Sequence, residues 1–362
     1  MRTIQMSSYT VGKDCFEAIP AALSPYRAKT VVLVGGRRAL TAAAPGIRAA
    51  LDDTDVQIID EIVYGTDSTQ SAIDALVANP AFRAADVAFA IGGGKAIDTV
   101  KTAAKELDKT VFSVPTICSN CSSATAIAVV YNDDHSLKGY AYPDAPAHIF
   151  INPAIIAAAP EEYFWAGIGD ALSKQPEVEY ATSGGGLTHT GALGLALAHT
   201  CTEPLMTFGE QGLADVRANR ASEAVKQIAL DIVVNTGYVS NLTNQPDFYY
   251  NSSLAHAFYN ATTGIPRGNR PYLHGEVVSF GVLVLFAYIG DTEQLERYAA
   301  FNKKLGLPVT LAELDLDESH LDRIAELARN TNEWKQGNPE PFTSAAFIEA
   351  IKTADAFGKN LA

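Results

Sequence analysis

Short apolar runs alternate with Ala-rich amphipathic stretches over the first 150 residues of the chain. Each run is β-branched, bounded by turn residues and too short for a helix, so it predicts a buried strand. The runs lie at 30–34, 56–63, 86–91 and 111–114, and two further strands are predicted at 126–131 and 148–151. Stretches of helical composition lie at 38–51, 70–78 and 96–107. This alternation predicts parallel βαβ units with helices on both faces of a sheet.

The pattern becomes helical after Pro153. Apolar residues then recur near i, i+3 and i+4, with Gly and Pro between the segments, as is typical of amphipathic helices. The segments lie at 166–179, 221–235, 253–262, 276–288, 293–305 and 319–328. We therefore predict a Rossmann-like α/β domain with a parallel sheet at 1–160, followed by an all-α domain at 161–362.

Composition narrows the classes of partner and of compartment. Hydrophobic residues make up 48% and charged residues 19%, which excludes wholesale disorder. Lys and Arg number 27 against 41 Asp and Glu, a net charge of −14, which argues against binding nucleic acid or an anionic membrane. Four cysteines form no disulfide framework, the N-terminus has no apolar signal segment, and the apolar run at 280–289 is too short to span a bilayer. We expect a cytoplasmic protein.

A glycine-rich turn, GGGK at 92–95, lies between the predicted strand at 86–91 and the helix at 96–107. Ligands of doubly wound sheets bind at the carboxyl ends of the strands, and a helix N-terminus offers free N–H groups to a phosphate. Glycines let the backbone approach the ligand, and Lys95 adds a positive charge. The turn therefore favours phosphate binding, with a tight βα turn as the simpler alternative.

The first βα turn, GGRR at 35–38, differs from a standard dinucleotide fingerprint. It lacks G-x-G-x-x-G, and no acidic residue ends the preceding strand to bind a ribose 2′-hydroxyl. Arg37 and Arg38 stand there instead, and Arg is the usual partner of a 2′-phosphate. The turn favours NADP(H) over NAD(H), unless both arginines are simply solvated surface residues.

Three scattered residues form a possible metal-binding set. Asp170 lies near a predicted helix start, His256 lies in a helix among apolar neighbours, and His274 begins the apolar helix. One Asp and two His make a competent zinc or ferrous triad with an open position. The simpler alternative, for each residue taken singly, is that Asp170 is an ordinary acid near a helix start and that each His is a core residue with its hydrogen bonds satisfied.

Five motifs change the weight of these observations: GGGKAID at 92–98, PTICSNCSSATAIAVVY at 115–131, GIGDAL at 167–172, LAHAFYN at 254–260 and LHGEVVSFG at 273–281. In this order the chain resembles the iron-containing, or group III, alcohol dehydrogenases, nearest the glycerol dehydrogenase and hydroxycarboxylate dehydrogenase branch. The resemblance covers essentially the whole chain. It implies a dehydroquinate synthase-like fold, an NAD(P) cofactor, one divalent metal and a homo-oligomer.

The motifs also assign roles to single residues. The resemblance implies metal ligands at Asp170, His256 and His274. It implies a pyrophosphate loop with Gly93, Gly94, Lys95 and Asp98, and a cofactor-lining segment with Thr116, Ser119, Thr125, Ile127 and Tyr131. That segment joins two predicted strands, so we expect it at the carboxyl edge of the sheet.

Two positions depart from the family pattern. Lys174 stands where many iron-type members have a fourth ligand, a His, which favours a three-ligand zinc site. Cys121 stands where glycerol dehydrogenases place an Asp close to the polyol, and losing that carboxylate removes repulsion against an acid substrate. Both departures favour the hydroxycarboxylate branch, with Lys174 as the candidate partner of the substrate carboxylate. Alternatively, Cys121 is a small packed residue and Lys174 a solvated one.

The sequence thus predicts a metal-dependent NAD(P)(H) oxidoreductase that interconverts a small 2-oxo acid, ketone or aldehyde and the hydroxy compound. Glycerol dehydrogenase activity, on glycerol and dihydroxyacetone, is the alternative. A dehydroquinate synthase-like lyase is less favoured, because those enzymes have Glu in place of Asp170 and need several basic residues. An idle nucleotide-binding protein would not need the intact Asp/His/His triad.

Overall fold

The computed structural model describes residues 3–268 and 270–361, which divide into two compact units. Unit 1 runs through Glu161 and takes in Ala214–Gly237, and unit 2 comprises Glu162–Leu213 and the chain from Tyr238 onward. The sequence placed 214–237 with the helical half. The structure assigns this stretch to unit 1, where α11 (Glu223–Leu230) packs against α6 (Pro153–Ala157).

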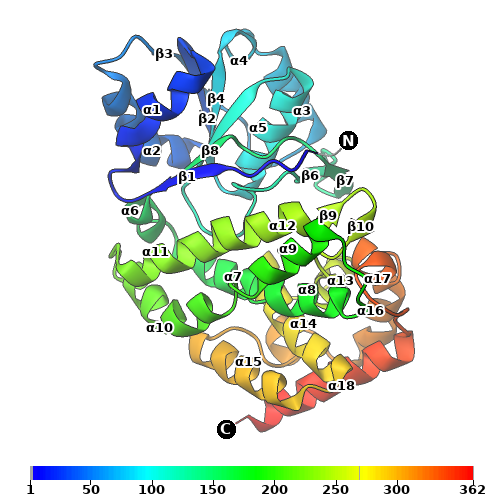
Figure 1. Cartoon of the computed structure of the whole chain (residues 1–362). Coiled ribbons are helices and arrows are strands. Elements are labelled where there is room, and N and C mark those ends of the chain that lie inside the picture. The colour runs from blue at the N-terminus through cyan, green and yellow to red at the C-terminus, as the bar shows by residue number, and fades with distance from the viewer. Residues whose placement is uncertain (1–2, 269, 362) are drawn as a thin grey trace. The chain divides into compact units, whose positions relative to one another are not determined.

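Unit 1 contains a parallel sheet of six strands among the described residues, in the order β1-β8-β5-β4-β2-β3 (Figure 1). The strands are β1 (Ser8–Val11), β2 (Thr30–Gly35), β3 (Gln57–Val63), β4 (Val87–Gly92), β5 (Thr110–Pro115) and β8 (His148–Ile151). Chain order reverses at β2, since β3 pairs on one side of it and β4 on the other. Ligands of doubly wound sheets bind at such a switch point, beyond the carboxyl ends of the strands.

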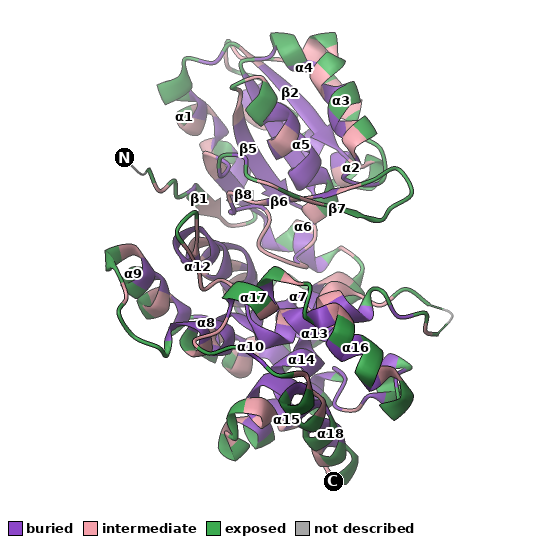
Figure 2. Ribbon diagram, turned by 90° about the vertical axis from the view of Figure 1, so that its right-hand side faces the viewer, coloured by how far each residue is buried: buried purple, intermediate pink, exposed green. Residues whose placement is uncertain are grey.

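Helices cover both faces of this sheet, as the sequence predicted. The helices of this unit include α1 (Ile19–Leu23), α2 (Arg37–Leu51), α3 (Gln70–Ala78), α4 (Pro80–Ala84) and α5 (Gly94–Glu106). Alternate residues of β2 serve the two faces, because successive strand side chains point in opposite directions. Val31 and Leu33 pack with Ile47 of α2, whereas Val32 and Val34 pack with Val100 of α5. Figure 2 shows the buried strands lying between these helices.

The predicted strand at 126–131 does not join the parallel sheet. It forms β6 (Ala128–Tyr131), which pairs antiparallel with β7 (Leu137–Ala141) in a separate two-stranded sheet. The sequence prediction missed β7 and also β1, which pairs with β8 at the sheet edge. Both missed strands carry polar residues among their apolar ones, so neither shows the apolar run of a central strand.

Among its described residues, unit 2 has helices and one short strand pair, β9 (Asn244–Gln245) and β10 (Phe248–Tyr249). Its helices include α7 (Glu161–Ala171), α8 (Lys174–Thr182), α9 (His189–Ala198), α13 (Leu254–Thr262), α14 (His274–Ile289), α15 (Thr292–Leu305), α16 (Leu321–Ala328), α17 (Asn332–Gln336) and α18 (Ser344–Asn360). Helix α14 is buried from Gly275 to Phe286 and contacts α13, α15 and α18, which explains its apolar run.

Some predicted helices are interrupted. The predicted helix at 166–179 is two helices, α7 and α8, which break between Ala171 and Lys174. The predicted helix at 221–235 is α11 followed by a π-helical turn at Asp231–Asn235, after which α12 (Thr236–Thr243) continues. Helix α10 (Glu203–Arg217), which the sequence did not predict, begins in unit 2 and ends in unit 1.

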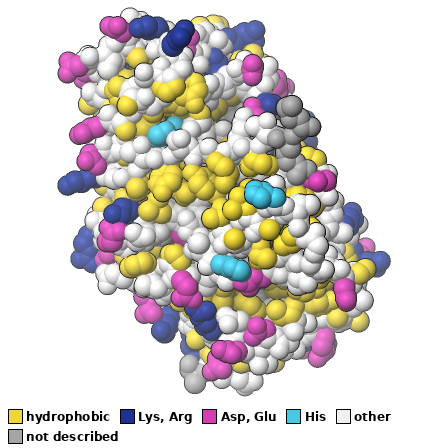
Figure 3. Space-filling model, in the orientation of Figure 1, with side chains coloured by type: hydrophobic (Ala, Val, Ile, Leu, Met, Phe, Trp, Pro, Cys, Tyr) yellow, Lys and Arg dark blue, Asp and Glu magenta, His cyan; other side chains and the backbone are white. Residues whose placement is uncertain are grey.

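Two features, the helices and the surface charges, bear on whether a protein binds a membrane or a polyanion. Among the described residues, no helix combines the length and the apolar character needed to cross a membrane. On the face shown in Figure 3, Lys and Arg side chains lie interspersed with Asp and Glu.

Candidate functional site

Three predicted ligands meet within unit 2. The ligand atoms of Asp170, His256 and His274, from α7, α13 and α14, all lie within 4.8 Å of one another. Asp170 Oδ1 is 2.9 Å from His274 Nε2 and 3.6 Å from His256 Nε2. Ligand atoms about 2.0–2.1 Å from a tetrahedral zinc ion are about 3.3 Å apart, so these distances fit a small divalent cation.

Two glycines bring Asp170 and His274 together. A Cβ atom on Gly275 would lie 1.7 Å from the Ala166 carbonyl oxygen and 2.6 Å from the Asp170 nitrogen. A Cβ atom on Gly169 would lie 2.4 Å from the Gly275 carbonyl oxygen. The start of α14 therefore packs backbone to backbone against α7, and only glycine leaves room for that approach.

His256 is held from its other side by Glu177 of α8. The Glu177 Oε2 atom lies 2.6 Å from His256 Nδ1, and Oε1 accepts hydrogen bonds from the backbone nitrogens of Ser253 and His256. The Glu177 side chain is 0% exposed. The ring therefore lies between two acids, with Nδ1 toward Glu177 and Nε2 toward Asp170.

The electrostatics of the cluster favour positive charge. Burial acts to raise the pKa of Asp170, but His274 and His256 outweigh it and hold that pKa well below its usual range. Burial acts to lower the pKa of His256, but Glu177 and Asp170 outweigh it and raise that pKa to about 10. A buried site whose acids hold a proton on His256 so strongly also suits a cation, and its N and O donors suit zinc or ferrous iron.

Lys174 lies one turn beyond Asp170 and is buried rather than solvated. Its Nζ donates to the backbone oxygen and to the side-chain Oδ1 of Asn251, both at 2.8 Å. We call residues 249–253 the strap, because they lead directly into α13. Glu333 also binds the strap, where it accepts a hydrogen bond from the hydroxyl of Tyr249 at 3.1 Å. Buried charged residues thus anchor the strap that leads into α13, the helix that carries His256.

The predicted phosphate loop lies at the switch point of the sheet in unit 1. Gly92 ends β4 with φ +148°, and Gly93 is the N-cap of α5. A Cβ atom on Gly93 would lie 2.4 Å from Ile117 Cδ1, and one on Gly94 would lie 2.8 Å from Asn120 Nδ2. The segment after β5 therefore packs on the turn, and the backbone of Thr116 donates to Gly92 at 3.1 Å. Free amides at the start of α5 suit a phosphate.

Lys95 is oriented by a carboxylate that the sequence analysis missed. Its Nζ lies 2.9 Å from Oδ2 of the buried Asp67 and 5.8 Å from the centre of the Tyr131 ring. Asp67 Oδ2 also lies 2.9 Å from His135 Nδ1. Because the Lys95 side chain is still 57% exposed, it remains accessible to an anion while its direction is set.

Three predicted cofactor residues converge on Lys101, which sequence reasoning also missed. The 0% exposed Lys101 side chain lies 3.0 Å from Asp98 Oδ1. Its Nζ donates to the backbone oxygens of Ser122, Thr125 and Ile127. Asp98 Oδ2 accepts from the backbone of Val129 at 3.0 Å. Asp98 and Lys101 of α5 therefore hold the cofactor-lining segment in place through its backbone.

Cys121 lies in the same segment and is half-buried. Its backbone oxygen accepts from Ala124 at 2.9 Å, and Ala124 packs against Gly237, where a Cβ atom would approach to 2.6 Å. Ser119 is also half-buried. The lining segment is thus packed between the phosphate loop and the start of α12.

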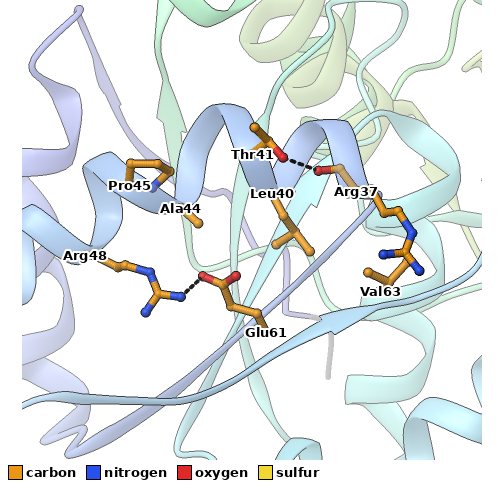
Figure 4. A pocket seen from close by; sticks show the side chains of 8 residues that line it. All are labelled: Arg37, Leu40, Thr41, Ala44, Pro45, Arg48, Glu61 and Val63. Carbon is orange, nitrogen blue, oxygen red and sulfur yellow. Dashed lines mark hydrogen bonds and ion pairs between the residues drawn. The ribbon is translucent and has the colours of Figure 1, made fainter.

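Arg37 begins α2 beside the end of β2. It lines an open pocket of about 480 Å³ together with Arg48, Glu61 and Val63. Figure 4 shows the Arg37 guanidinium beside Val63, whereas Arg48 is paired with Glu61. Of the two arginines that line this pocket, Arg48 forms the ion pair with Glu61 and Arg37 does not.

Sequence reasoning missed residues that act through hydrogen bonds rather than through a motif. They are Asp67, Lys101, Asn120, Glu177, Asn251 and Glu333. Glu177 had one signal: a carboxylate two helical turns after Asp170, next to Val178, in a stretch of apolar spacing. The others carry no pattern that sets them apart from surface residues.

The chain is similar to known proteins in sequence and in fold. The model of the family described as iron-containing alcohol dehydrogenase matches residues 7–153. A glycerol dehydrogenase of Thermotoga maritima is 34% identical over 285 residues, which cover 76% of each chain. Hydroxycarboxylate dehydrogenase A of Escherichia coli is 30% identical over 276 residues, 75% of each chain. A crystal structure of a probable glycerol dehydrogenase from Sinorhizobium meliloti superposes with a TM-score of 0.83 at 25% identity and covers 100% of both chains.

Proposed function

The chain belongs to the iron-containing alcohol dehydrogenase family, and on that premise we propose that it oxidises and reduces a small vicinal hydroxy compound with NAD(P) at the metal cluster of unit 2. Dehydrogenation of CH–OH groups is the chemistry of the family, and its members use NAD(H) and a divalent metal, iron or zinc. Family membership does not decide which metal, coenzyme and substrate this chain uses.

The observation that carries the proposal is the cluster of Asp170, His256 and His274 within 4.8 Å. A divalent cation bound there supplies Lewis-acid polarisation of the substrate oxygen, and the dinucleotide supplies or accepts the hydride. The protein's own part is to fix donors and charge. Asp170 provides the negative charge, the two imidazoles provide neutral donors, and the amides at the start of α5 receive the pyrophosphate.

For the metal we propose zinc. Lys174 stands where a fourth, histidine ligand would be, and its Nζ is engaged by Asn251. Three protein ligands with an open position are typical of catalytic zinc. Elemental analysis of protein reconstituted with equal zinc and ferrous iron tests the choice, and preferential retention of iron would contradict it.

For the coenzyme we propose a preference for NADP(H). No acid follows β2, and Arg37 lies at that position with its guanidinium away from the Arg48–Glu61 pair. Charge-assisted hydrogen bonds contribute about 1.5–3 kcal/mol, so Arg37→Ala should raise KM for NADPH at least about tenfold and leave KM for NADH nearly unchanged. Equal effects on both coenzymes would remove this role.

For the substrate, the best-supported candidate is a small polyol and its hydroxyketone. Glycerol dehydrogenases of Thermotoga maritima and Escherichia coli match 76% and 97% of the chain, respectively. Two neighbouring oxygens suit a metal with an open position, because one of them can be oriented while the other reacts.

The second candidate is a 2-hydroxy acid and its 2-oxo acid. Cys121 leaves the predicted polyol position without a carboxylate, and the Escherichia coli hydroxycarboxylate dehydrogenase matches 75% of the chain. Lys174 is the candidate partner of the substrate carboxylate. Two of its three N–H donors are used by Asn251, so only the third serves that role.

A substrate panel read at 340 nm separates these candidates. Glycerol would be tested with NAD or NADP, and dihydroxyacetone, 2-oxobutyrate and 2-oxoglutarate with NADH or NADPH, each with and without zinc. Turnover of the polyol pair alone would remove the hydroxy-acid proposal, and inactivity with all four would contradict the proposed function. Lys174→Met should raise KM for an oxo acid far more than KM for an uncharged aldehyde if Lys174 binds a carboxylate. Equal losses would leave it the structural role that its contacts with Asn251 describe.

Self-association and a cytoplasmic location stay predictions. Light scattering of the purified protein tests the first, since a monomer at micromolar concentration would contradict a homo-oligomer.

A further inference from the structure

Glu177 is a buried acid that no proposed reaction step uses. Its side chain is 0% exposed, yet it accepts three hydrogen bonds around the start of α13. Oε1 accepts from the nitrogens of Ser253 at 2.7 Å and of His256 at 3.0 Å, and Oε2 lies 2.6 Å from His256 Nδ1. Burying a carboxylate costs free energy unless hydrogen bonds or ion pairs compensate it. The contacts of Glu177 therefore indicate its role.

The contact with Nδ1 decides the state of the His256 ring. A carboxylate only accepts hydrogen bonds, so Nδ1 must carry the proton. A neutral imidazole has a single N–H, which leaves the lone pair on Nε2, the nitrogen that lies 3.6 Å from Asp170 Oδ1. We propose that Glu177 is the positioning residue that fixes His256 as an Nε2 ligand of the metal, an inference that rests on the metal site proposed above.

The same carboxylate fixes the helix that carries the ring. Ser253 is the N-cap of α13, but its side chain makes no capping hydrogen bond. Glu177 Oε1 instead accepts from the N-cap nitrogen and from the His256 nitrogen in the first turn, which lacks an intrahelical partner. One side chain therefore sets the helix start, the ring direction and the ring proton together.

The substitution Glu177→Gln separates these roles. Gln keeps one oxygen, which can still accept from the two backbone nitrogens, so the helix start and the fold should survive. Its amide nitrogen would then face His256 Nδ1 as a donor, which forces Nδ1 to accept and moves the proton to Nε2. The ring would then present N–H toward the metal position. Loss of an outer-shell partner typically weakens metal binding about 10–100-fold, and we expect that loss here.

Glu333→Gln is the matched control. Glu333 is also buried, and it also binds the strap, but its partners are the hydroxyls of Tyr249 and Ser252. Hydroxyl groups rotate to suit an amide, and no imidazole proton depends on this residue. We expect its zinc affinity to stay within twofold of the wild-type value.

The experiment compares zinc dissociation constants of the wild-type protein and both variants by competition with a chromophoric chelator. Circular dichroism confirms that each variant is folded. An E177Q protein that is folded and binds zinc as tightly as the wild type overturns the inference. A wild-type protein that binds no zinc or other divalent ion overturns the metal site itself.

A measurement on the unmodified protein makes the test independent of any variant's folding. In ¹⁵N-histidine-labelled, zinc-loaded protein, long-range ¹H–¹⁵N spectra distinguish protonated from bare ring nitrogens. His256 is assigned among the seven histidines by comparison with His256→Gln. We expect a protonated Nδ1 and a bare, metal-shifted Nε2, and E177Q should reverse or scramble this pattern. The opposite tautomer in wild-type protein contradicts the inference.

Discussion

The phosphate loop of unit 1 and the metal cluster of unit 2 are built from opposite kinds of residue. The loop at 92–95 depends on glycine, because Ile117 and Asn120 occupy the space that a Cβ atom on Gly93 or Gly94 would need. The cluster works through buried charge, since Asp170 and Glu177 enclose the His256 ring.

The two regions also differ in how much buried charge the protein must balance when no ligand is bound. The loop would offer a phosphate the neutral amides at the start of α5 and the charge of Lys95, whose side chain is exposed to water in the free protein. The cluster must balance its own buried charge before any cation arrives, and it does so through the contacts between Asp170, Glu177 and the imidazoles. Changes of volume should therefore affect both regions, and most strongly where backbone meets backbone in the cluster, whereas changes of charge or donor should damage the cluster most.

His274→Ala should have the largest effect. It removes one of the three proposed ligands, and a catalytic cation contributes several kcal/mol of transition-state stabilisation, so kcat/KM should fall at least about a thousandfold. Elemental analysis should show loss of bound metal while the affinity for NAD(P)H stays within about twofold. Full metal occupancy in this variant would remove the triad.

Gly275→Ala tests whether volume also matters in the cluster. The new methyl group would lie 1.7 Å from the Ala166 oxygen, so the start of α14 must shift away from α7. We expect destabilisation by about 2–3 kcal/mol in urea and roughly a hundredfold lower kcat/KM, because His274 moves with the helix.

Gly36→Ala is the control for that change. Its new Cβ atom meets only Tyr64 Cε1, at 4.0 Å. Metal content and stability should therefore be close to those of the wild type. If Gly275→Ala behaved like this control, the backbone approach of the two helices would not be needed for the site.

Gly93→Ala tests the loop through volume alone. Its Cβ atom would lie 2.4 Å from Ile117 Cδ1, the flexible end of a side chain, so the Ile117 side chain must move away from the turn. We expect coenzyme binding about five- to tenfold weaker, equivalent to roughly 1 kcal/mol, with metal content unchanged. The double variant Gly93→Ala/Ile117→Ala should recover most of the affinity in fluorescence titrations of NAD(P)H, and no recovery would contradict the steric explanation.

Asp231→Asn should have the smallest effect on metal and coenzyme binding, because Asp231 belongs to neither proposed site, and it should change the pH dependence of stability instead. Asp231 is buried in the π-helical turn and accepts from Asn235, but within the described residues its Oδ2 has no hydrogen-bond partner. Burial raises the pKa of Asp231 well above its ordinary value. The folded state therefore binds one proton more than the unfolded state once the pH exceeds the ordinary Asp value, and stability falls as pH rises from there.

Asn does not titrate, so the stability of the variant relative to the wild type should increase with pH from about 4 upward. The limit for one proton is about 1.4 kcal/mol per pH unit. Urea unfolding at pH 5 and pH 8 measures the difference. A difference independent of pH would show that Asp231 does not retain its proton in the folded protein.

The sequence reveals the loop far better than the cluster's surroundings. Strand, turn and helix around GGGK are contiguous, so local pattern was enough to place the loop at the carboxyl edge of the sheet. The lateral position of β6 was missed because pairing with β7 depends on a hairpin whose strands are short and partly polar.

Motifs predicted Asp170, His256 and His274 as ligands, and the structure brings these three residues together, but no motif pointed to the residues that hold them. Glu177 and Asn251 gain their meaning only when α8 and the strap pack together, and no local pattern encodes that contact. Lys174 shows the limit most clearly. It was weighed as a solvated residue or a substrate contact, and packing makes it a buried anchor of the strap.

The return of Ala214–Gly237 to unit 1 has a consequence for biosynthesis. The nascent chain emerges from the ribosome N-terminus first, and the sheet strands through β8 appear long before α11. Unit 1 cannot bury the surface that α11 covers on α6 until well over half of the chain has been made. The nascent unit 1 therefore exposes the surface of α6 that α11 later covers, and chaperone binding would matter most at this stage of synthesis.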